Sequence, residues 1–201
     1  MLALGVLVDA NVLYSRTIRD WIALLFTRQS AEEFFRIYWT EDILAEVISS
    51  FRARHPNASG GQVTRIRDSL AATFAGGRVD DFRIDGTFPG SDEKDRHVHA
   101  AAIACGADLV LTKDRDFTKH RDPDNVPYEV YCPDEFFLLV EDNRPDLVRS
   151  VTGEQAGYWS GRLGSVNLPD QLRRVGCPGF AERVRGHLCA LETIRNPAAP
   201  P

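Results

Sequence analysis

The sequence predicts an α/β fold, with a three-layer α/β/α domain over residues 1–140 and a small helical extension over residues 141–201 that ends in a frayed tail. Two observations predict this class. Short apolar segments of strand length alternate with segments of helical period, which favours a parallel sheet covered on both faces. In addition, 201 residues, 43% of them hydrophobic, can bury one sizeable core.

Five short segments, among them LGVLVD, RIYWT and DLVLT, have the length and apolar content of strands. Each is separated from the next by a helical pattern, as right-handed crossovers between parallel strands require. The five predicted strands are residues 4–9, 36–40, 82–84, 108–112 and 128–132.

Helical patterns fill the intervals between these segments. After Thr40, the apolar residues of EDILAEVISSF repeat at helical spacing, and Thr40 can cap that helix, with Glu41 and Asp42 in its first turn. Other helical patterns are predicted over residues 14–35, 63–74, 93–105, 134–143 and 145–191, and NPAAPP forms the tail.

The composition excludes several classes of protein. No apolar run approaches the roughly 18 residues that span a bilayer, and the apolar N-terminal stretch lacks a cationic start, so we expect a cytoplasmic protein without a membrane partner. The four cysteines show no C-x-x-C or C-x-x-H spacing, which favours reduced, packed thiols over a disulfide framework or a zinc site.

The charge balance by itself argues against a nucleic-acid partner, because 24 basic residues face 29 acidic ones. However, 21 of the 24 are arginine, whose planar fork suits phosphate. Residues 51–78 carry five arginines against Asp68 alone. This region is a candidate wall of an RNA groove or a surface for an acidic partner.

Acidic residues fall where an open α/β sheet binds its ligands, at the carboxyl ends of strands and in the first turns of helices. Asp9 ends the first predicted strand, Asp114 and Asp116 follow the fourth, and Asp95 opens the alanine-rich helix on its inward stripe. Glu46 lies outside the apolar arc of its helix, so it faces either solvent or a cleft.

Such a set of carboxylates indicates a metal site. A single aspartate at a strand end is more often a cap or a solvated turn residue, but several at one sheet edge cannot all stay ionised without a counter-charge. Oxygen ligands without histidine or cysteine select Mg²⁺ or Mn²⁺ over zinc. A site of this kind suits hydrolysis of phosphodiesters.

Three motifs resemble those of PIN-domain ribonucleases, in order and spacing: VLVDANVLYS, WTEDILAEV and SDEKDRHVHAAAIACGADLVLTKDRDF. The similarity covers residues 4–137 and is closest to VapC-type toxins of toxin–antitoxin pairs, in a subgroup with a C-terminal helical extension. It implies a Rossmann-like PIN fold with strand order 3-2-1-4-5.

The resemblance also assigns roles to the acidic residues. Asp9, Glu46, Asp95 and Asp114 are implied to be catalytic, and Asp9, Asp95, Asp114 and Asp116 are implied metal ligands. The loop T-K-D-R-D-F offers two acids for the fourth position, so either Asp114 or Asp116 can fill it.

Other residues are expected to support the site. Asn11, two residues past Asp9, is expected to orient that carboxylate or to satisfy the backbone of a turn. Thr112 is expected to support Asp114 in the same way. Basic residues that can meet an RNA backbone, or can be plain solvated surface, are Arg96, Lys113, Arg115, Arg52 and Arg54.

The implied activity is a metal-dependent endoribonuclease: water activated by Mg²⁺ or Mn²⁺ attacks an RNA phosphodiester in line and leaves 5′-phosphate and 3′-hydroxyl ends. The implied partners are an RNA substrate, a cognate antitoxin that covers the acidic cleft, and a second copy in a homodimer. Two alternatives within the family are an RNA-processing nuclease without an antitoxin and a catalytically silent module that binds RNA or protein.

Two other classes of protein are disfavoured. A response-regulator receiver needs an acceptor aspartate after its third strand and a lysine after its fifth, and neither residues 84–86 nor residues 131–133 supply them. A haloacid-dehalogenase-like phosphatase needs aspartate where Asn11 stands.

Overall fold

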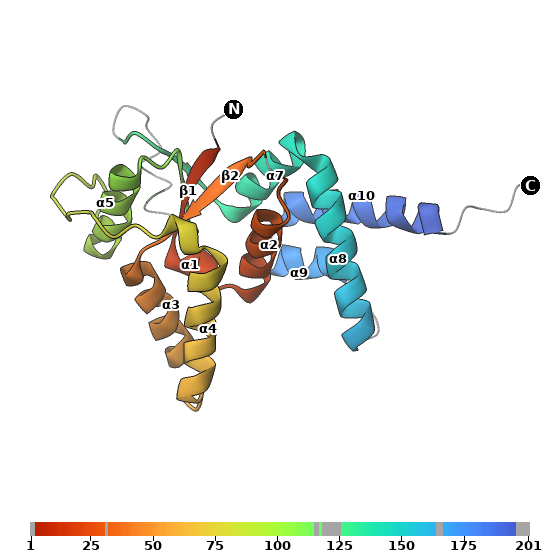
Figure 1. Ribbon diagram of the computed structural model, residues 1–201, viewed down its shortest axis with the longest axis horizontal. Coiled ribbons are helices and arrows are strands. Elements are labelled where there is room, and N and C mark those ends of the chain that lie inside the picture. Colours follow the sequence, from red (N-terminus) through yellow and green to blue (C-terminus); the bar gives the residue numbers. More distant parts are fainter. Residues whose placement is uncertain (1–2, 31, 115–116, 118–125, 164–166, 196–201) are drawn as a thin grey trace, which may run out of the picture.

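A computed structural model describes residues 3–30, 32–114, 117, 126–163 and 167–195 (Figure 1). Four parallel strands form the sheet in the order β2-β1-β3-β4. Their bounds are Leu4–Val8 for β1, Phe35–Tyr38 for β2, Leu109–Leu111 for β3 and Glu129–Tyr131 for β4. Helices flank this sheet, which confirms the predicted three-layer α/β/α class with a C-terminal helical extension.

The predicted strand at residues 82–84 is wrong, although the order of the other four strands agrees with the prediction. In place of a fifth strand, one parallel bridge joins Trp39 of the β2 side to Arg78. Past that bridge the chain cannot bury an apolar row, since Ile84 is 58% exposed and Arg83 also faces solvent. Without burial, three residues gain too little to pair as a strand.

Gly77 allows the chain to approach β2 closely at this edge. A Cβ atom at Gly77 would lie 1.7 Å from the carbonyl oxygen of Ile37, so no other residue fits without movement of the backbone. The Gly77 carbonyl accepts from the Trp39 amide at 3.0 Å, and the Val79 amide donates to the Trp39 carbonyl at 2.9 Å. These bonds cover the edge of the sheet that a fifth strand would have covered.

Most helices lie close to their predicted positions, but the pattern over residues 14–35 forms a helix only over Arg16–Thr27, and that over residues 145–191 divides into α8, α9 and α10. Thr40 caps its helix as predicted, since its hydroxyl accepts from the Ile43 amide at 3.1 Å. The described helices are α1 (Ala10–Leu13), α2 (Arg16–Thr27), α3 (Glu41–Arg54), α4 (Gly60–Thr73), η1 (Ala75–Gly77), η2 (Glu93–Asp95), α5 (Arg96–Cys105), α7 (Pro133–Asn143), α8 (Pro145–Leu163), α9 (Leu168–Arg174) and α10 (Pro178–Arg195).

The C-terminal helices share one hydrophobic core with the sheet domain. Helix α10 packs on α7, α8 and α9, while α8 and α9 pack on α2. Phe180 lies at their meeting point with no exposed area. Its ring meets Trp21 of α2 edge-on at 5.1 Å and stacks on Phe137 of α7 at 4.7 Å. The extension is therefore packed into the core and is not a loosely attached tail (Figure 1).

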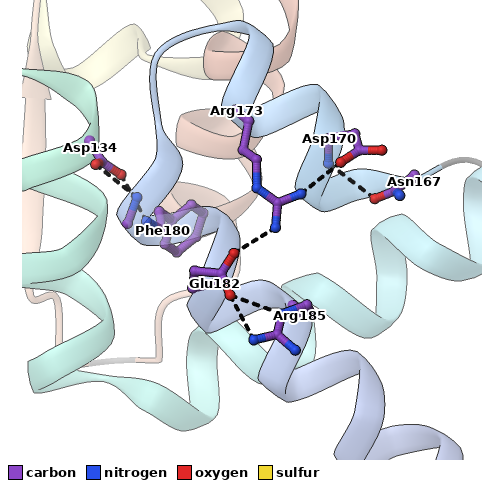
Figure 2. Close-up of polar contacts among 8 residues, drawn as sticks. Asp134, Asn167, Asp170, Arg173, Phe180, Glu182 and Arg185 are labelled. Atoms are coloured by element: carbon purple, nitrogen blue, oxygen red, sulfur yellow. Dashed lines mark hydrogen bonds and ion pairs between the residues drawn. The ribbon is translucent and has the colours of Figure 1, made fainter.

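Polar contacts fix the start of α10 in the same region (Figure 2). The Asp134 carboxylate of α7 accepts from the amides of Gly179 and Phe180 at 3.0 and 2.8 Å, so a negative charge caps the N-terminus of α10. On the outer side, Arg173 of α9 bonds Glu182 of α10 at 2.5 Å. The first contact thus fixes the start of α10 on α7, and the second joins α10 to α9.

No helix in the described part of the chain is both long enough and apolar enough to cross a membrane.

Replacing Phe180 tests whether the extension contributes to the stability of the whole domain. We expect Phe180→Ala to lower the free energy of unfolding by about 3–5 kcal/mol, because it leaves a cavity between the Trp21 and Phe137 rings. Urea denaturation should still show a single transition. As a control, Ile84→Ala should change the free energy of unfolding by less than about 0.5 kcal/mol. A second, earlier transition in Phe180→Ala would contradict a shared core.

Candidate active site

Asp9 lies at the carboxyl end of β1, the central position of the candidate site. Its backbone amide extends the sheet by donating to the Leu111 carbonyl at 3.0 Å. Its side chain turns back to cap α1, where Oδ1 accepts from the Ala10 amide at 2.5 Å. Asp9 is only 4% exposed, so hydrogen bonds from nearby donors must replace the water that its carboxylate loses on burial.

Asn11 and Thr112 supply those donors to the other carboxylate oxygen. The Thr112 hydroxyl donates to Asp9 Oδ2 at 2.6 Å, and the Asn11 side-chain amide donates to the same oxygen. The hydrogen bond predicted between Asn11 and Asp9 is therefore present. Both oxygens of the buried carboxylate are fixed in orientation, one from α1 and one from the end of β3.

The same two side chains organise the loop that follows β3. Asn11 Oδ1 accepts from the Lys113 amide at 2.9 Å, and Thr112 Oγ1 accepts from the Asp114 amide at 2.9 Å. The sequence predicts that Thr112 orients the Asp114 carboxylate; its hydroxyl instead accepts from the Asp114 amide and from the Asn11 side chain, and donates to the Asp9 carboxylate. Asp114 is half-buried at this strand end.

Glu46 is held on α3 by a histidine of the alanine-rich helix α5. His97 Nε2 lies 3.0 Å from Glu46 Oε1. The histidine side chain is 11% exposed and that of Glu46 is 46% exposed, so the carboxylate is open to solvent. Because α3 contacts α1, this pair lies beside the helix that Asp9 caps.

The electrostatics of Asp9 show how close these groups are. Burial raises the pKa of Asp9 above its ordinary value of 3.8. The hydrogen bonds from Thr112 and from the Ala10 amide lower this pKa, the charge of Glu46 raises it, and His97 lowers it. Asp9 and Glu46 are thus close enough to repel one another, and a cation between them would relieve that repulsion.

Asp95 lies where η2 meets α5 and is half-buried, in line with its predicted inward stripe. Its charge adds to burial in raising the pKa of Tyr128, which places the carboxylate near that phenol. The Tyr128 hydroxyl in turn lies 2.7 Å from His99 Nδ1. His97 and His99 therefore serve different partners, as their opposite directions on the helix predict.

The candidate ligands fit a hard divalent cation in their chemistry. All are carboxylates, of which Asp9 and Asp114 follow β1 and β3, and burial raises the pKa of Asp9, which a bound cation would offset. Among the described residues, however, no three His, Cys, Asp or Glu side chains are gathered closely enough to hold a metal. Asp116 and Arg115 lie outside the described residues.

The other predicted RNA-binding residues differ in the partners that their side chains contact. Arg96 is exposed and pairs with Glu93 at 3.0 Å. Arg52 donates to the Ala58 carbonyl at 3.3 Å, and Arg54 lies over the Tyr14 ring at 5.4 Å. Of the four described residues in this set, Lys113 is the one that contacts the extension.

Two features of the site were not predicted from the sequence. Lys113 Nζ donates to the Val175 carbonyl at the end of α9 at 3.1 Å, and burial lowers its pKa. His97 contacts Glu46, although the two residues are 51 positions apart in the sequence. Both contacts join segments far apart in the chain, so no local pattern predicts them.

The fold is an α/β domain in which Asp9 follows β1 and Asp114 follows β3, at the carboxyl ends of neighbouring parallel strands. A family model described as PIN domain matches residues 5–116, more than half of the chain, and the chain therefore belongs to the PIN domain family. PIN domains are generally nucleases. No curated protein and no solved structure matches the chain.

The raised pKa of Asp9 predicts how stability depends on pH in the metal-free protein. Between pH 3.8 and the higher pKa of the folded state, the folded protein binds more protons than the unfolded chain, so the free energy of unfolding falls as pH rises. This fall in the free energy of unfolding amounts to about 1.4 kcal/mol for each unit by which the pKa is raised, and Asp9→Asn should abolish it. Urea denaturation between pH 3.5 and 7 in EDTA measures the difference.

Thr112→Val should enlarge the loss of stability with rising pH that Asp9→Asn abolishes. It removes a hydrogen bond that lowers the pKa of Asp9, so the loss of stability should extend to higher pH than in the wild type. Identical pH slopes for the wild type and Asp9→Asn would show that Asp9 is not the group responsible.

Proposed function

We propose that this protein is a divalent-metal-dependent endoribonuclease whose site lies at the carboxyl ends of β1 and β3. The observation that carries the proposal is the buried Asp9 carboxylate, held in a fixed orientation by Asn11 and Thr112 and within electrostatic range of Glu46. Burying a charge in this way is costly for folding alone, so a functional role for Asp9 is favoured.

In this proposal Asp9, Asp95 and Asp114 or Asp116 hold Mg²⁺ or Mn²⁺. When bound, such an ion activates water for in-line attack on a phosphodiester and stabilises the leaving oxygen. The residues of the chain do the remaining work. Asn11 and Thr112 keep Asp9 in one orientation, so the carboxylate needs no rearrangement when the ion and the RNA arrive.

Glu46 has a different role in the proposal. It is the most exposed of the candidate acids that the structure describes, and His97 Nε2 contacts its Oε1 atom. The carboxylate can therefore accept a proton from the attacking water while His97 keeps it aimed at the site. The products would carry 5′-phosphate and 3′-hydroxyl ends.

The finer biological role follows the resemblance to VapC-type toxins. We propose that the nuclease acts on RNA in the cytoplasm as the toxin of a two-protein module, possesses a cognate antitoxin and forms a homodimer. Induced expression of the wild type should then stop growth, and co-expression of the product of a short adjacent reading frame should restore it. Growth arrest by Asp9→Asn as well would contradict a toxicity based on cleavage.

Cleavage of RNA tests the activity directly. Purified protein with mixed RNAs and Mn²⁺ or Mg²⁺ should cleave internally, and EDTA should stop the reaction. Glu46→Gln should lower kcat by about 10²–10⁴-fold, because it removes a proton acceptor, and Asp9→Asn should lower it at least as much. End-labelling of the products identifies the 5′-phosphate.

A neighbouring acid provides the matched control. Asp42 is an exposed carboxylate in the first turn of the same helix as Glu46, so Asp42→Asn should keep wild-type kcat. Undiminished cleavage by Asp9→Asn, or cleavage that persists in EDTA, would refute the metal-nuclease proposal. RNA binding without any cleavage by the wild type would favour the catalytically silent alternative.

Metal binding has a readout that does not depend on activity. At a Mn²⁺ concentration about 100 times the Kd, the free energy of unfolding of the wild type should rise by about 2.7 kcal/mol. Asp9→Asn should lose this gain, while Asp42→Asn should keep it. An equal rise in all three proteins would show that the ion binds elsewhere.

A further inference from the structure

An open groove lies between α2, the end of α3, and α4. Its volume is about 770 Å³. Tyr14, Arg16, Arg19, Phe51, His55 and Arg65 are among its lining residues and define what we call the α2–α4 groove. Two smaller hollows of about 390 and 220 Å³ continue it, because the first shares Phe51 and His55 with the groove and the second shares Arg16.

The charge along this surface is strongly positive. The charged residues that line the groove and its two continuations are four arginines and one aspartate, namely Arg16, Arg19, Arg54, Arg65 and Asp20. Arg16 and Arg65 are exposed, and Arg16 lies 3.5 Å from Asp20, which matches one of the four positive charges. A concave surface of this sign attracts a polyanion.

The basic region predicted from residues 51–78 is therefore divided by the fold. Arg54 and Arg65 line the groove or its continuation. By contrast, Arg78 pairs with Glu41 at 3.1 Å and with Asp80 at 2.7 Å, and Arg67 pairs with Asp68 at 3.2 Å. Arginines whose charge is already matched contribute less to binding, so the groove is the part of this region that suits an anionic ligand.

Aromatic rings alternate with the arginines along the same path. Arg54 lies over the Tyr14 ring at 5.4 Å, and Arg16 lies over the Trp159 ring at 5.9 Å. Between them, Phe51 and His55 pack at 4.6 Å. Positive charge interleaved with aromatic rings is the arrangement with which proteins hold single-stranded nucleic acid, because phosphates meet the cations and bases stack on the rings.

The groove begins close to the candidate active site. Asp9 caps the start of the single-turn helix α1 and Tyr14 caps its end. Tyr14 therefore lies about 7.5 Å from Asp9 along the axis of that helix. On α3, Arg54 lies about 80° around the helix from Glu46 and Phe51 about 140°, at roughly 100° per residue. Arg54 thus lies about two turns of α3 beyond Glu46, and Tyr14 lies about one turn beyond Asp9, so the groove lies next to the candidate site.

We propose that the α2–α4 groove holds the single-stranded RNA that flanks the scissile phosphate, and so sets the minimum length of a good substrate. This proposal rests on the endoribonuclease activity proposed above. The observations favour RNA over an acidic peptide because the guanidiniums alternate with ring faces, which serve bases better than carboxylate side chains. In addition, Tyr14 in the groove lies at the end of helix α1, and Asp9 lies at the start of that helix.

Binding is measured without cleavage, using Asp9→Asn protein in EDTA and a fluorescently labelled 12-nucleotide RNA without secondary structure. Arg16→Glu with Arg65→Glu should raise Kd at least tenfold at about 0.1 M salt. The slope of log K against log salt should become shallower by about 1.4, the value for two lost phosphate contacts at about 0.7 each. Tyr14→Leu should weaken binding and Tyr14→Phe should preserve it.

The matched control is Arg149→Glu with Arg183→Glu on α8 and α10. These arginines are about half exposed, and each pairs with an aspartate as Arg16 does, so the control makes the same change in charge. The control should bind RNA like the Asp9→Asn parent. An equal loss of RNA affinity in both double variants would show that binding depends only on the net charge of the protein, and would overturn the proposal.

Substrate length separates the groove from the active site in otherwise wild-type protein. The double variant Arg16→Glu with Arg65→Glu should cleave a tetranucleotide at the wild-type kcat/KM but should show at least a tenfold higher KM for the 12-nucleotide RNA. Equal losses for both lengths would indicate damage to the active site and would overturn the groove proposal.

The remaining outcomes are also decisive. Cleavage by the wild type together with unchanged binding by the double variant would refute the groove and leave the nuclease intact. Absence of both binding and cleavage in the wild type would refute both proposals. If the double variant instead loses binding of a poly-glutamate peptide while RNA binding is unchanged, the groove serves an acidic protein partner and the RNA proposal is wrong.

Discussion

The hydrogen bond from Thr112 to Asp9 is the interaction on which the arrangement of the site depends. It joins residues 103 positions apart and locks the ends of β1 and β3 to each other. Thr112 has no exposed area, so no water can replace its hydroxyl in this bond. Because the amide of Asp114 is bonded to the same hydroxyl, the course of the chain beyond β3 is set by the group that orients Asp9.

The layers of the fold were predictable because they depend on local periodicity. The helix after Thr40 and the strand before Asp9 follow from the spacing of apolar residues and from one capping side chain. The failure at residues 82–84 has a non-local cause. The bridge between Trp39 and Arg78, permitted by Gly77, already covers that edge of the sheet, and Ile84 beyond it stays 58% exposed.

The site was predictable in part for a related reason. Asn11 stands two residues from Asp9, so their contact is a local one, and it is present. The contact between His97 and Glu46 spans 51 residues and that between Lys113 and Val175 spans 62, so both depend on the tertiary fold. Helical geometry also separates neighbours: Arg65 and Arg67 point about 200° apart, which puts one in the groove and pairs the other with acids.

The packing of Phe180 against Trp21 and Phe137 has a consequence for how the protein matures during synthesis. Phe180 of α10 completes a core that begins with Trp21 of α2, so this core can close only after α10 has been synthesised. The tether from Lys113 to Val175 likewise forms only after α9 has emerged. The contacts that hold the core and the loop after β3 in place are therefore completed only once α9 and α10 have been synthesised.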